Sequence, residues 1–288
     1  MNYQWYPGHM TKARRMMEEN IQLIDLMIEL LDARVPEASR NPDINVLGKN
    51  KARLVILNKA DLADDKINKK WIRSFQEQGI TALEINSKNG EGVKNIQSAV
   101  QVACKEKTER DRRRGIIARP VRAMVVGIPN VGKSTLINSI AGKASTKTGN
   151  KPGVTKGKQW IRLNKNLELL DTPGILWPKM ADPSTGLKLA LIGSMNDEIL
   201  SSEDMAYELM KILAVDYPGI LEKRFPVLAG VTEPIEVMQK IARSRGCLLK
   251  GDELDLVKAA GILMDEFRNG KLGRISLESP AEEILVTE

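Results

Sequence analysis

Residues 127–135 read GIPNVGKST and fit G-x-x-x-x-G-K-[ST], the pattern of a phosphate-binding loop. The apolar run RAMVV precedes this pattern, and the helix-like run TLINSIAGK follows it. Glycines let backbone N–H groups surround phosphates, and the following helix adds the positive end of its dipole. Lys133 is therefore expected to reach the β- and γ-phosphates, and the Ser134 hydroxyl to bind Mg²⁺. The residues predicted to contact phosphate in this phosphate loop are Asn130, Val131, Gly132, Lys133, Ser134 and Thr135.

A second phosphate-side motif is DTPG, residues 171–174, directly after the apolar run LELL. Asp171, at the end of a predicted strand, can hold Mg²⁺ through water, and the Gly174 N–H can reach the γ-phosphate. Thr155 lies between the two motifs in the Gly- and Lys-rich stretch NKPGVTKGK. A single loop threonine carries little weight, but its place behind a phosphate loop makes Thr155 a candidate Mg²⁺ ligand in a first switch.

The base-recognition signal is NKAD, residues 58–61, at the end of the apolar run RLVILN. The Asp61 carboxylate can accept hydrogen bonds from guanine N1–H and N2–H₂, which adenine does not offer. The Lys59 stem can lie over the purine, and Asn58 can tie this base loop to the phosphate loop. After the next apolar run, backbone amides of a turn could meet guanine O6. The residues predicted for the base side are Asn58, Lys59, Ala60, Asp61, Asn86, Ser87 and Lys88.

Short apolar runs alternate with amphipathic segments through the first part of the chain, which predicts a mostly parallel α/β sheet. The expected strands are residues 26–32, 53–58, 81–86, 122–127 and 167–171. Residues 105–120, KEKTERDRRRGIIARP, read either as a solvated connection between two blocks of the sheet or as the exposed end of a helix. After residue 178 helical periodicity dominates, with an expected N-cap at Ser201 and Asp204 three residues later. The predicted domains are residues 1–178 and 179–288.

The chain has 288 residues, 42% of them hydrophobic, and a net charge of +7. Residues 179–288 hold 13 basic and 19 acidic residues, so the first 178 hold 31 and 18 of the total of 44 and 37. This basic first part, net +13, predicts a polyanionic partner beyond a nucleotide, with solubility as the alternative. No apolar run approaches the ~20 residues of a membrane span. With two separated cysteines and no secretory signal, we expect a cytoplasmic protein without a membrane partner.

The order NKAD, NSK, GIPNVGKS, PGVT, DTPG is similar to that of the circularly permuted GTPases. With WYPGHM, LLDARVPEASRNP and the helical C-terminal part, the chain resembles the ribosome biogenesis GTPase A family of the YlqF type. The resemblance implies a circularly permuted Ras-like GTPase domain, then a smaller all-α domain that contacts ribosomal RNA. It also implies GTP as substrate, GDP as product, and a role in late assembly of the large ribosomal subunit. No stable protein partner is predicted.

The permutation places the helical part directly after DTPGILWP, the loop expected to sense the γ-phosphate. Nucleotide state is therefore expected to act on the helical domain. A reconnection without mechanical consequence is the alternative.

Water activation is the least determined part of the predicted site. Ile175 stands where Ras-like enzymes have a water-orienting glutamine, and an apolar side chain cannot do that. His9, the only histidine, is the candidate catalytic residue, with a surface or N-capping role as the alternative. Asn130 matches the position that helps hold K⁺ in potassium-activated GTPases. We therefore expect slow hydrolysis by the isolated protein and stimulation by the ribosomal subunit.

Basic patches supply the expected RNA surface. They read TKARRMM, ERDRRRG, KASTKTGNKPGVTKGK and, in the helical part, KIARSRGCLLK (240–250). Two interpretations of these patches remain: they contact RNA phosphates, or they are simply a solvated surface. The alternative function is an RNA-binding scaffold for which GTP is a structural ligand and hydrolysis incidental.

Overall fold

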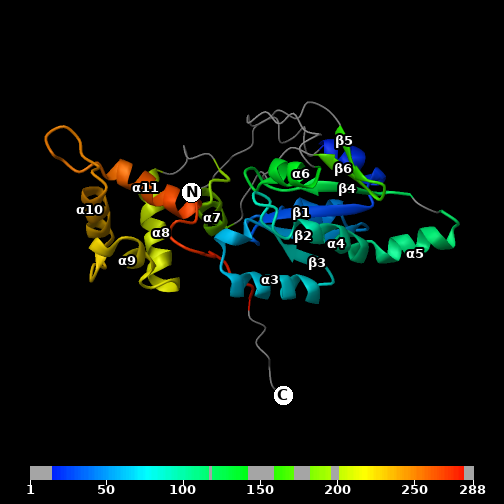
Figure 1. Cartoon of the computed structure of the whole chain (residues 1–288), viewed down its shortest axis with the longest axis horizontal. Helices are drawn as coiled ribbons and strands as arrows, with labels where there is room; N and C mark the ends of the chain where they lie inside the picture. The colour runs from blue at the N-terminus through cyan, green and yellow to red at the C-terminus, as the bar shows by residue number, and fades with distance from the viewer. Residues whose placement is uncertain (1–14, 117–118, 142–158, 172–181, 196–200, 282–288) are drawn as a thin grey trace, which may run out of the picture. The chain divides into compact units, whose positions relative to one another are not determined.

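The computed structural model describes residues 15–116, 119–141, 159–171, 182–195 and 201–281 (Figure 1). Two compact units make up the chain. The first comprises Met1–Ala181 and Glu278–Glu288, and the second comprises Asp182–Leu277. The expected division at residue 178 thus lies three residues before this boundary. The final segment, expected with the helical domain, instead belongs to the first unit.

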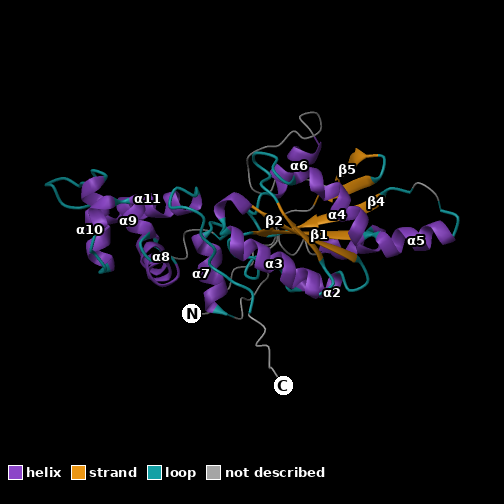
Figure 2. Ribbon diagram, turned by 60° about the horizontal axis from the view of Figure 1, so that its bottom comes forward, coloured by secondary structure: helices purple, strands orange, loops and turns teal. Residues whose placement is uncertain are grey.

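The first unit is built on a six-stranded sheet of order β3-β2-β1-β4-β6-β5. The strands are β1 Leu26–Asp32, β2 Ala52–Asn58, β3 Thr81–Glu84, β4 Val121–Val126, β5 Gln159–Asn164 and β6 Leu167–Asp171. All neighbours pair in parallel except β5, which runs antiparallel to β6 at one edge. Strands β2 and β3, which carry the base-side motifs, therefore form one half of the sheet together with β1, and the phosphate-side strands β4 and β6 lie in the other half with β5 (Figure 2).

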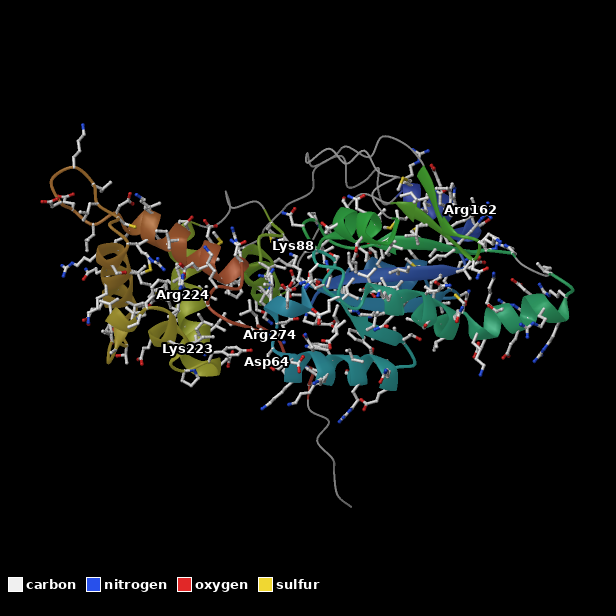
Figure 3. All side chains as sticks on the ribbon, in the orientation of Figure 1. Asp64, Lys88, Arg162, Lys223, Arg224 and Arg274 are labelled. Carbon is white, nitrogen blue, oxygen red and sulfur yellow. The ribbon has the colours of Figure 1, made fainter. Side chains whose placement is uncertain are left out.

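Strand β5 is the element that the sequence pattern did not indicate. Its residues read QWIRLN and follow the Lys- and Gly-rich stretch that we expected to be a loop. Ile161 is buried, whereas Trp160 is 36% exposed and Arg162 is exposed (Figure 3). In an antiparallel edge strand with one solvent-exposed face, only every second residue is apolar, so the sequence shows no continuous apolar run. The five expected strands are all present, and β1 and β6 have the expected bounds.

Parallel strands must be covered on both faces, and the burial of β1 shows this, since all seven of its residues are buried. Met27, Leu31, Val55 and Leu57 share one face through the parallel register of β1 and β2. Leu31, Val55 and Leu57 form one core cluster with Trp71 and Phe75 of helix α3 (Asp65–Glu77). The other helices of this unit are α2 Asp43–Leu47, α4 Ile96–Ala103, α5 Lys105–Arg113 and α6 Lys133–Ala141.

Helix α5 bears on both interpretations of the segment 105–120. Residues Lys105–Arg113 are helical and mostly exposed, and they connect α4 to β4, so both the helix end and the solvated connection are present. The helix has no buried residues, and Arg110, Arg112 and Arg113 lie in its last turn. The high charge density is therefore that of a solvated helix.

The second unit is all-helical. Its helices are α7 Pro183–Leu191, α8 Ser202–Asp216, α9 Ile220–Arg224, α10 Pro234–Ser244 and α11 Leu256–Arg268. The expected N-cap of α8 is confirmed, because the Ser201 hydroxyl accepts from the Asp204 N–H at 3.0 Å. Helix α8 packs on α11, and each helix has buried residues, Leu209 and Leu263 among them.

A buried carboxylate engages one arginine of the basic segment 240–250. Glu266 is 5% exposed and accepts from Arg224 Nε and Arg245 Nη2, each at 2.7 Å. Figure 3 shows Arg224 on this unit. The hydrogen bond from Arg224 and the charge of Arg245 outweigh the effect of burial and lower the pKa of Glu266. Arg245, which lies in the basic segment expected to contact RNA, is thus held by an ion pair with Glu266.

None of the helices in the described ranges is both long and apolar enough to cross a membrane.

Candidate guanine-nucleotide site

The phosphate loop, the base loop and the turn at residues 86–90 each follow a strand of the parallel sheet. They come after β4, β2 and β3, respectively. Since β1 lies between β2 and β4 and all three run in parallel, the carboxyl ends of these strands meet at one edge. Ligands of open α/β sheets bind outside this edge. The topology therefore brings together the base-side and phosphate-side motifs.

The Asn58 side chain joins all three segments. Its Nδ2 donates to the Val131 carbonyl at 2.7 Å, and its Oδ1 accepts from the Ser87 N–H at 3.0 Å. The side chain is buried, with the residue only 1% exposed. A buried amide with both ends satisfied fixes its neighbours strongly, because breaking either bond leaves an unsatisfied polar group. The expected link from Asn58 to the phosphate loop is present.

Gly132 lets the phosphate loop approach Asn58 this closely. A Cβ at this position would overlap Asn58 Nδ2, and the backbone φ of +95° lies in the region that favours glycine. Asn130, two residues earlier, also has a positive φ of 60°. The tight backbone of a phosphate loop is therefore formed here through residue types that tolerate this conformation.

Residues 133–135 form the first turn of α6. Lys133 is 9% exposed, whereas Ser134 and Thr135 are exposed. The helix N-terminus and the exposed Ser134 hydroxyl fit a phosphate-bound Mg²⁺. Asp171 ends β6 and pairs in register with Val125 of β4, two residues before the phosphate loop. The backbone thus brings two of the predicted Mg²⁺ ligands to the same edge of the sheet.

Lys59 is held at the base end by a buried carboxylate. Its backbone is left-handed, with φ of 58°, and its Nζ lies 2.9 Å from Asp32 Oδ2. Asp32 ends β1 and is fully buried, and Arg34 donates to it through Nε at 2.9 Å and Nη2 at 2.8 Å. Burial by itself raises the pKa of Asp32, but the charges and hydrogen bonds of Arg34 and Lys59 outweigh it and hold the pKa well below its usual range. The carboxylate therefore stays ionised and fixes the lysine.

Asp32 and Arg34 were not among the predicted site residues. Their signal was available in LLDARVP, where an acid ends a mostly apolar strand and a base lies two residues later. Charges at that point have to be paired, because the strand end is buried.

The turn after β3 is ordered by hydrogen bonds within the protein. Two of the amides expected to meet guanine O6 have protein acceptors: Ser87 N–H donates to Asn58, and Lys88 N–H donates to Asn86 Oδ1 at 2.9 Å. Asn86 is buried and orders the turn, whereas the Lys88 side chain is exposed (Figure 3). Asp61 is exposed too, and the adjacent Ala60 N–H donates to the Ile85 carbonyl at 3.1 Å. The turn therefore acts as a support for the base loop in this structure.

Three predicted site residues, His9, Thr155 and Gly174, lie outside the described residues, as does Ile175. The structure describes the backbone of Asp171 but not its side chain. Among the described residues there is no cluster of three or more His, Cys, Asp or Glu side chains suited to a metal ion. The catalytic role of His9, the Mg²⁺ ligands and the K⁺ role of Asn130 thus stay predictions.

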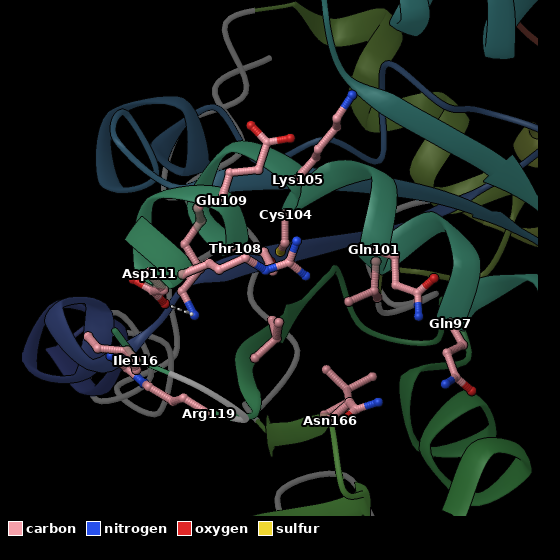
Figure 4. A pocket seen from close by; sticks show the side chains of 15 residues that line it. Gln97, Gln101, Cys104, Lys105, Thr108, Glu109, Asp111, Ile116, Arg119 and Asn166 are labelled. Atoms are coloured by element: carbon pink, nitrogen blue, oxygen red, sulfur yellow. Dashed lines mark ion pairs between the residues drawn. The ribbon is translucent and has the colours of Figure 1, made fainter. Parts of the chain in front are cut away.

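A cavity of about 470 Å³ lies away from these residues (Figure 4). It is lined by α4, α5 and the beginnings of β4 and β6, and Cys104 is part of its wall. Burial raises the pKa of the Cys104 thiol to about 11, so the thiol is protonated and unreactive. None of the predicted nucleotide-binding residues lines this cavity.

The fold and the site define the class of the protein. Its phosphate-side strands and its base-side strands form one Ras-like sheet, but the base side comes first in the chain, as in a circularly permuted GTPase. A family model described as 50S ribosome-binding GTPase matches residues 122–211.

Curated relatives and solved structures resolve the family. Ribosome biogenesis GTPase A of Bacillus cereus is 47% identical over 98% of this chain and 95% of its own length. The Thermotoga maritima protein of the same name is 34% identical over 96% and 95%. A crystal structure of GNP-bound YlqF from T. maritima covers 93% of this chain and 98% of its own, with a TM-score of 0.69 and 29% identity. A GDP-bound YlqF structure gives a TM-score of 0.68 at 28% identity and covers 92% and 99%. The chain belongs to the ribosome biogenesis GTPase A family.

Proposed function

We propose that this protein binds and hydrolyses GTP and acts in the cytoplasm as an assembly factor for late maturation of the large (50S) ribosomal subunit. The observation that carries the nucleotide part is the Asn58 side chain, which joins the base loop to the phosphate loop and to the turn after β3. An ATP-binding protein has no use for Asp61 beside such a loop. The ribosomal part is supported by the names of the relatives.

Each part of the site has a proposed role in phosphoryl transfer. Lys133 binds the β- and γ-phosphates, and Gly174 donates its N–H to the γ-phosphate. Ser134, Thr155 and Asp171 hold Mg²⁺, which when bound neutralises charge on the phosphate oxygens. Asn130 contributes to a K⁺ site. His9 positions the attacking water, because Ile175 cannot.

Nucleotide state is proposed to act on the helical unit through the chain itself. The motif DTPG ends at residue 174, and the helical unit begins at Asp182. A segment that orders around the γ-phosphate and relaxes after hydrolysis is therefore continuous with the start of that unit. Measuring GTP hydrolysis with and without purified large subunits tests the proposed function as a whole.

Helix α5 is the surface proposed for contact with ribosomal RNA. Arg112, Arg113 and Arg114 are exposed at its end, and the helix contributes no buried residue to a core. Arginines held on a solvated helix suit the phosphate backbone of RNA, which is recognised by charge and shape. The remaining basic patches lie partly in residues 1–14 and 142–158, which the structure does not describe.

Replacing Arg112, Arg113 and Arg114 together by Ala is expected to weaken binding to the large subunit and to reduce its salt dependence. The slope of log affinity against log salt is negative, and each lost phosphate contact reduces its magnitude by about 0.7–0.9. We therefore expect the magnitude of the slope to fall by about 2 in the triple variant. Sedimentation of the protein with large subunits over a salt series measures this slope. The matched control replaces three exposed basic residues of α3, Lys66, Lys70 and Arg73. Equal effects of the two triple variants would rule out a specific role for α5.

A further inference from the structure

Glu278, which directly follows the helical unit, is bound to a loop of the GTPase unit. Its carboxylate accepts from the Glu37 N–H at 2.8 Å and from the Ala38 N–H at 3.1 Å to Oε2 and 3.2 Å to Oε1. The Trp71 indole Nε1 donates to the Glu278 carbonyl at 3.3 Å. A charged acceptor on two consecutive amides forms hydrogen bonds about twice as strong as neutral ones. Both the side chain and the backbone of Glu278 are thereby fixed to unit 1.

The loop that Glu278 binds closes back on Asp32. Ser39 is buried, and its hydroxyl accepts from the Asp32 N–H at 3.2 Å and donates to the Val35 carbonyl at 2.7 Å. The Val35 N–H in turn donates to the Asp32 carbonyl at 3.0 Å. Residues 33–40 therefore form a tight loop whose hydrogen bonds converge on Asp32, and two of its amides are covered by Glu278.

Asp32 completes the path to the base loop. Its carboxylate holds Lys59 at 2.9 Å, and Lys59 is the residue whose stem is proposed to lie over the purine. The loop also fixes this carboxylate, because the Arg34 N–H donates to Asp32 Oδ1 at 3.1 Å and the Arg34 guanidinium donates to both carboxylate oxygens. The position of Lys59 thus depends on the loop, two amides of which are bound by Glu278.

We propose that Glu278 is a positioning residue for the guanine base, acting through the loop at residues 33–40 and Asp32 on Lys59. This inference rests on the proposed binding of guanine nucleotides at this site. The helical unit ends at Leu277. The next residue, Glu278, therefore contacts the loop at residues 33–40 directly where the chain re-enters the first unit. Nucleotide affinity is therefore expected to depend on Glu278, the residue at which the chain leaves the helical unit.

Glu278→Gln and Glu278→Ala are the test variants, and Glu222→Gln, an exposed carboxylate of α9, is the matched control. We expect the GDP dissociation constant to rise about fivefold or more in Glu278→Ala, less in Glu278→Gln, and not in the control. Displacement of a fluorescent GDP analogue measures the affinity. Tripolyphosphate, which has no base, should compete with the same affinity in all the proteins, a result that general loosening of the fold would not produce.

Two further variants keep the proposal testable if Glu278→Ala does not fold. Ser39→Ala removes the hydroxyl between the loop and Asp32, and Trp71→Phe removes the indole donor to Glu278. Each is expected to weaken GDP binding and to leave tripolyphosphate binding unchanged. If the wild type binds GDP and its affinity is unchanged in Glu278→Gln, Ser39→Ala and Trp71→Phe, the inference about Glu278 is wrong but the proposed function stands. A wild type that does not bind GDP would overturn the proposed function itself.

Discussion

Asp61→Asn is expected to weaken GTP binding by about 10²–10⁴-fold and to improve the binding of XTP. The carboxylate is proposed to accept two hydrogen bonds from guanine, and a hydrogen bond to a charged group contributes about 1.5–3 kcal/mol. An asparagine amide can instead donate to the 2-carbonyl of xanthine, which a carboxylate repels. Competition of GTP, XTP and ATP against a fluorescent nucleotide measures both changes.

The effect should be confined to the base. Asp61 is exposed, so its replacement should leave the melting temperature nearly unchanged. Asp65→Asn, a nearby exposed position in α3, is the matched control and should bind GTP like the wild type. If Asp61→Asn bound GTP normally, or if ATP displaced the label from the wild type as well as GTP does, base recognition through Asp61 would be wrong.

Asp32→Asn is expected to lower the free energy of unfolding at pH 7 by about 3–5 kcal/mol, because it removes the counter-charge of the buried Arg34 guanidinium. Arg34 is 1% exposed and depends on Asp32 for two side-chain hydrogen bonds, and Lys59 loses its ion pair. Urea denaturation measures the change. The variant should also bind GDP more weakly, since Lys59 is no longer held.

The pH dependence of this stabilisation has a definite sign. The pKa of Asp32 in the folded protein lies below the 3.8 of the unfolded chain, so ionised Asp32 stabilises the fold at all pH values well above 3.8. This contribution is lost as the pH falls below about 4 towards the folded-state pKa. The difference in unfolding free energy between wild type and Asp32→Asn should therefore shrink in that range. A constant difference down to pH 3, or an equal loss in the exposed control Asp265→Asn, would contradict the role of the Asp32 ion pairs.

Much of the fold could be predicted because parallel strands are buried on both faces and therefore appear in the sequence as short, mostly apolar runs. The runs 26–32 and 167–171 are mostly apolar and match β1 and β6. Strand β5 could not be predicted in this way, because among its side chains that the structure describes only Ile161 is buried. The return of the chain to the first unit at Glu278 could not be predicted either. Its carboxylate binds two amides about 240 residues earlier, and such a long-range contact produces no local sequence pattern.

The site was predictable where function depends on a local motif and less so where it depends on support from a distance. Asn58 was expected to reach the phosphate loop, and its hydrogen bond to Val131 confirms this. The role of Asp32 became visible only when β1 and β2 were placed side by side, with Asp32 paired in register to Asn58. The turn at Ser87 shows the opposite case, in which a donor expected to serve the ligand serves Asn58.

The most direct test of the central claim is the rate of GTP hydrolysis in K⁺ buffer, with and without purified large ribosomal subunits. We predict slow turnover alone and a stimulation of about 10²-fold or more with the subunit, the contribution typical of a correctly placed catalytic base. Stimulation would mean that the particle completes the active site or brings a residue such as His9 into position. Binding to the subunit that is independent of nucleotide, with no stimulation, would favour the RNA-binding scaffold. A subunit that neither binds nor stimulates would contradict the proposed role in ribosome assembly.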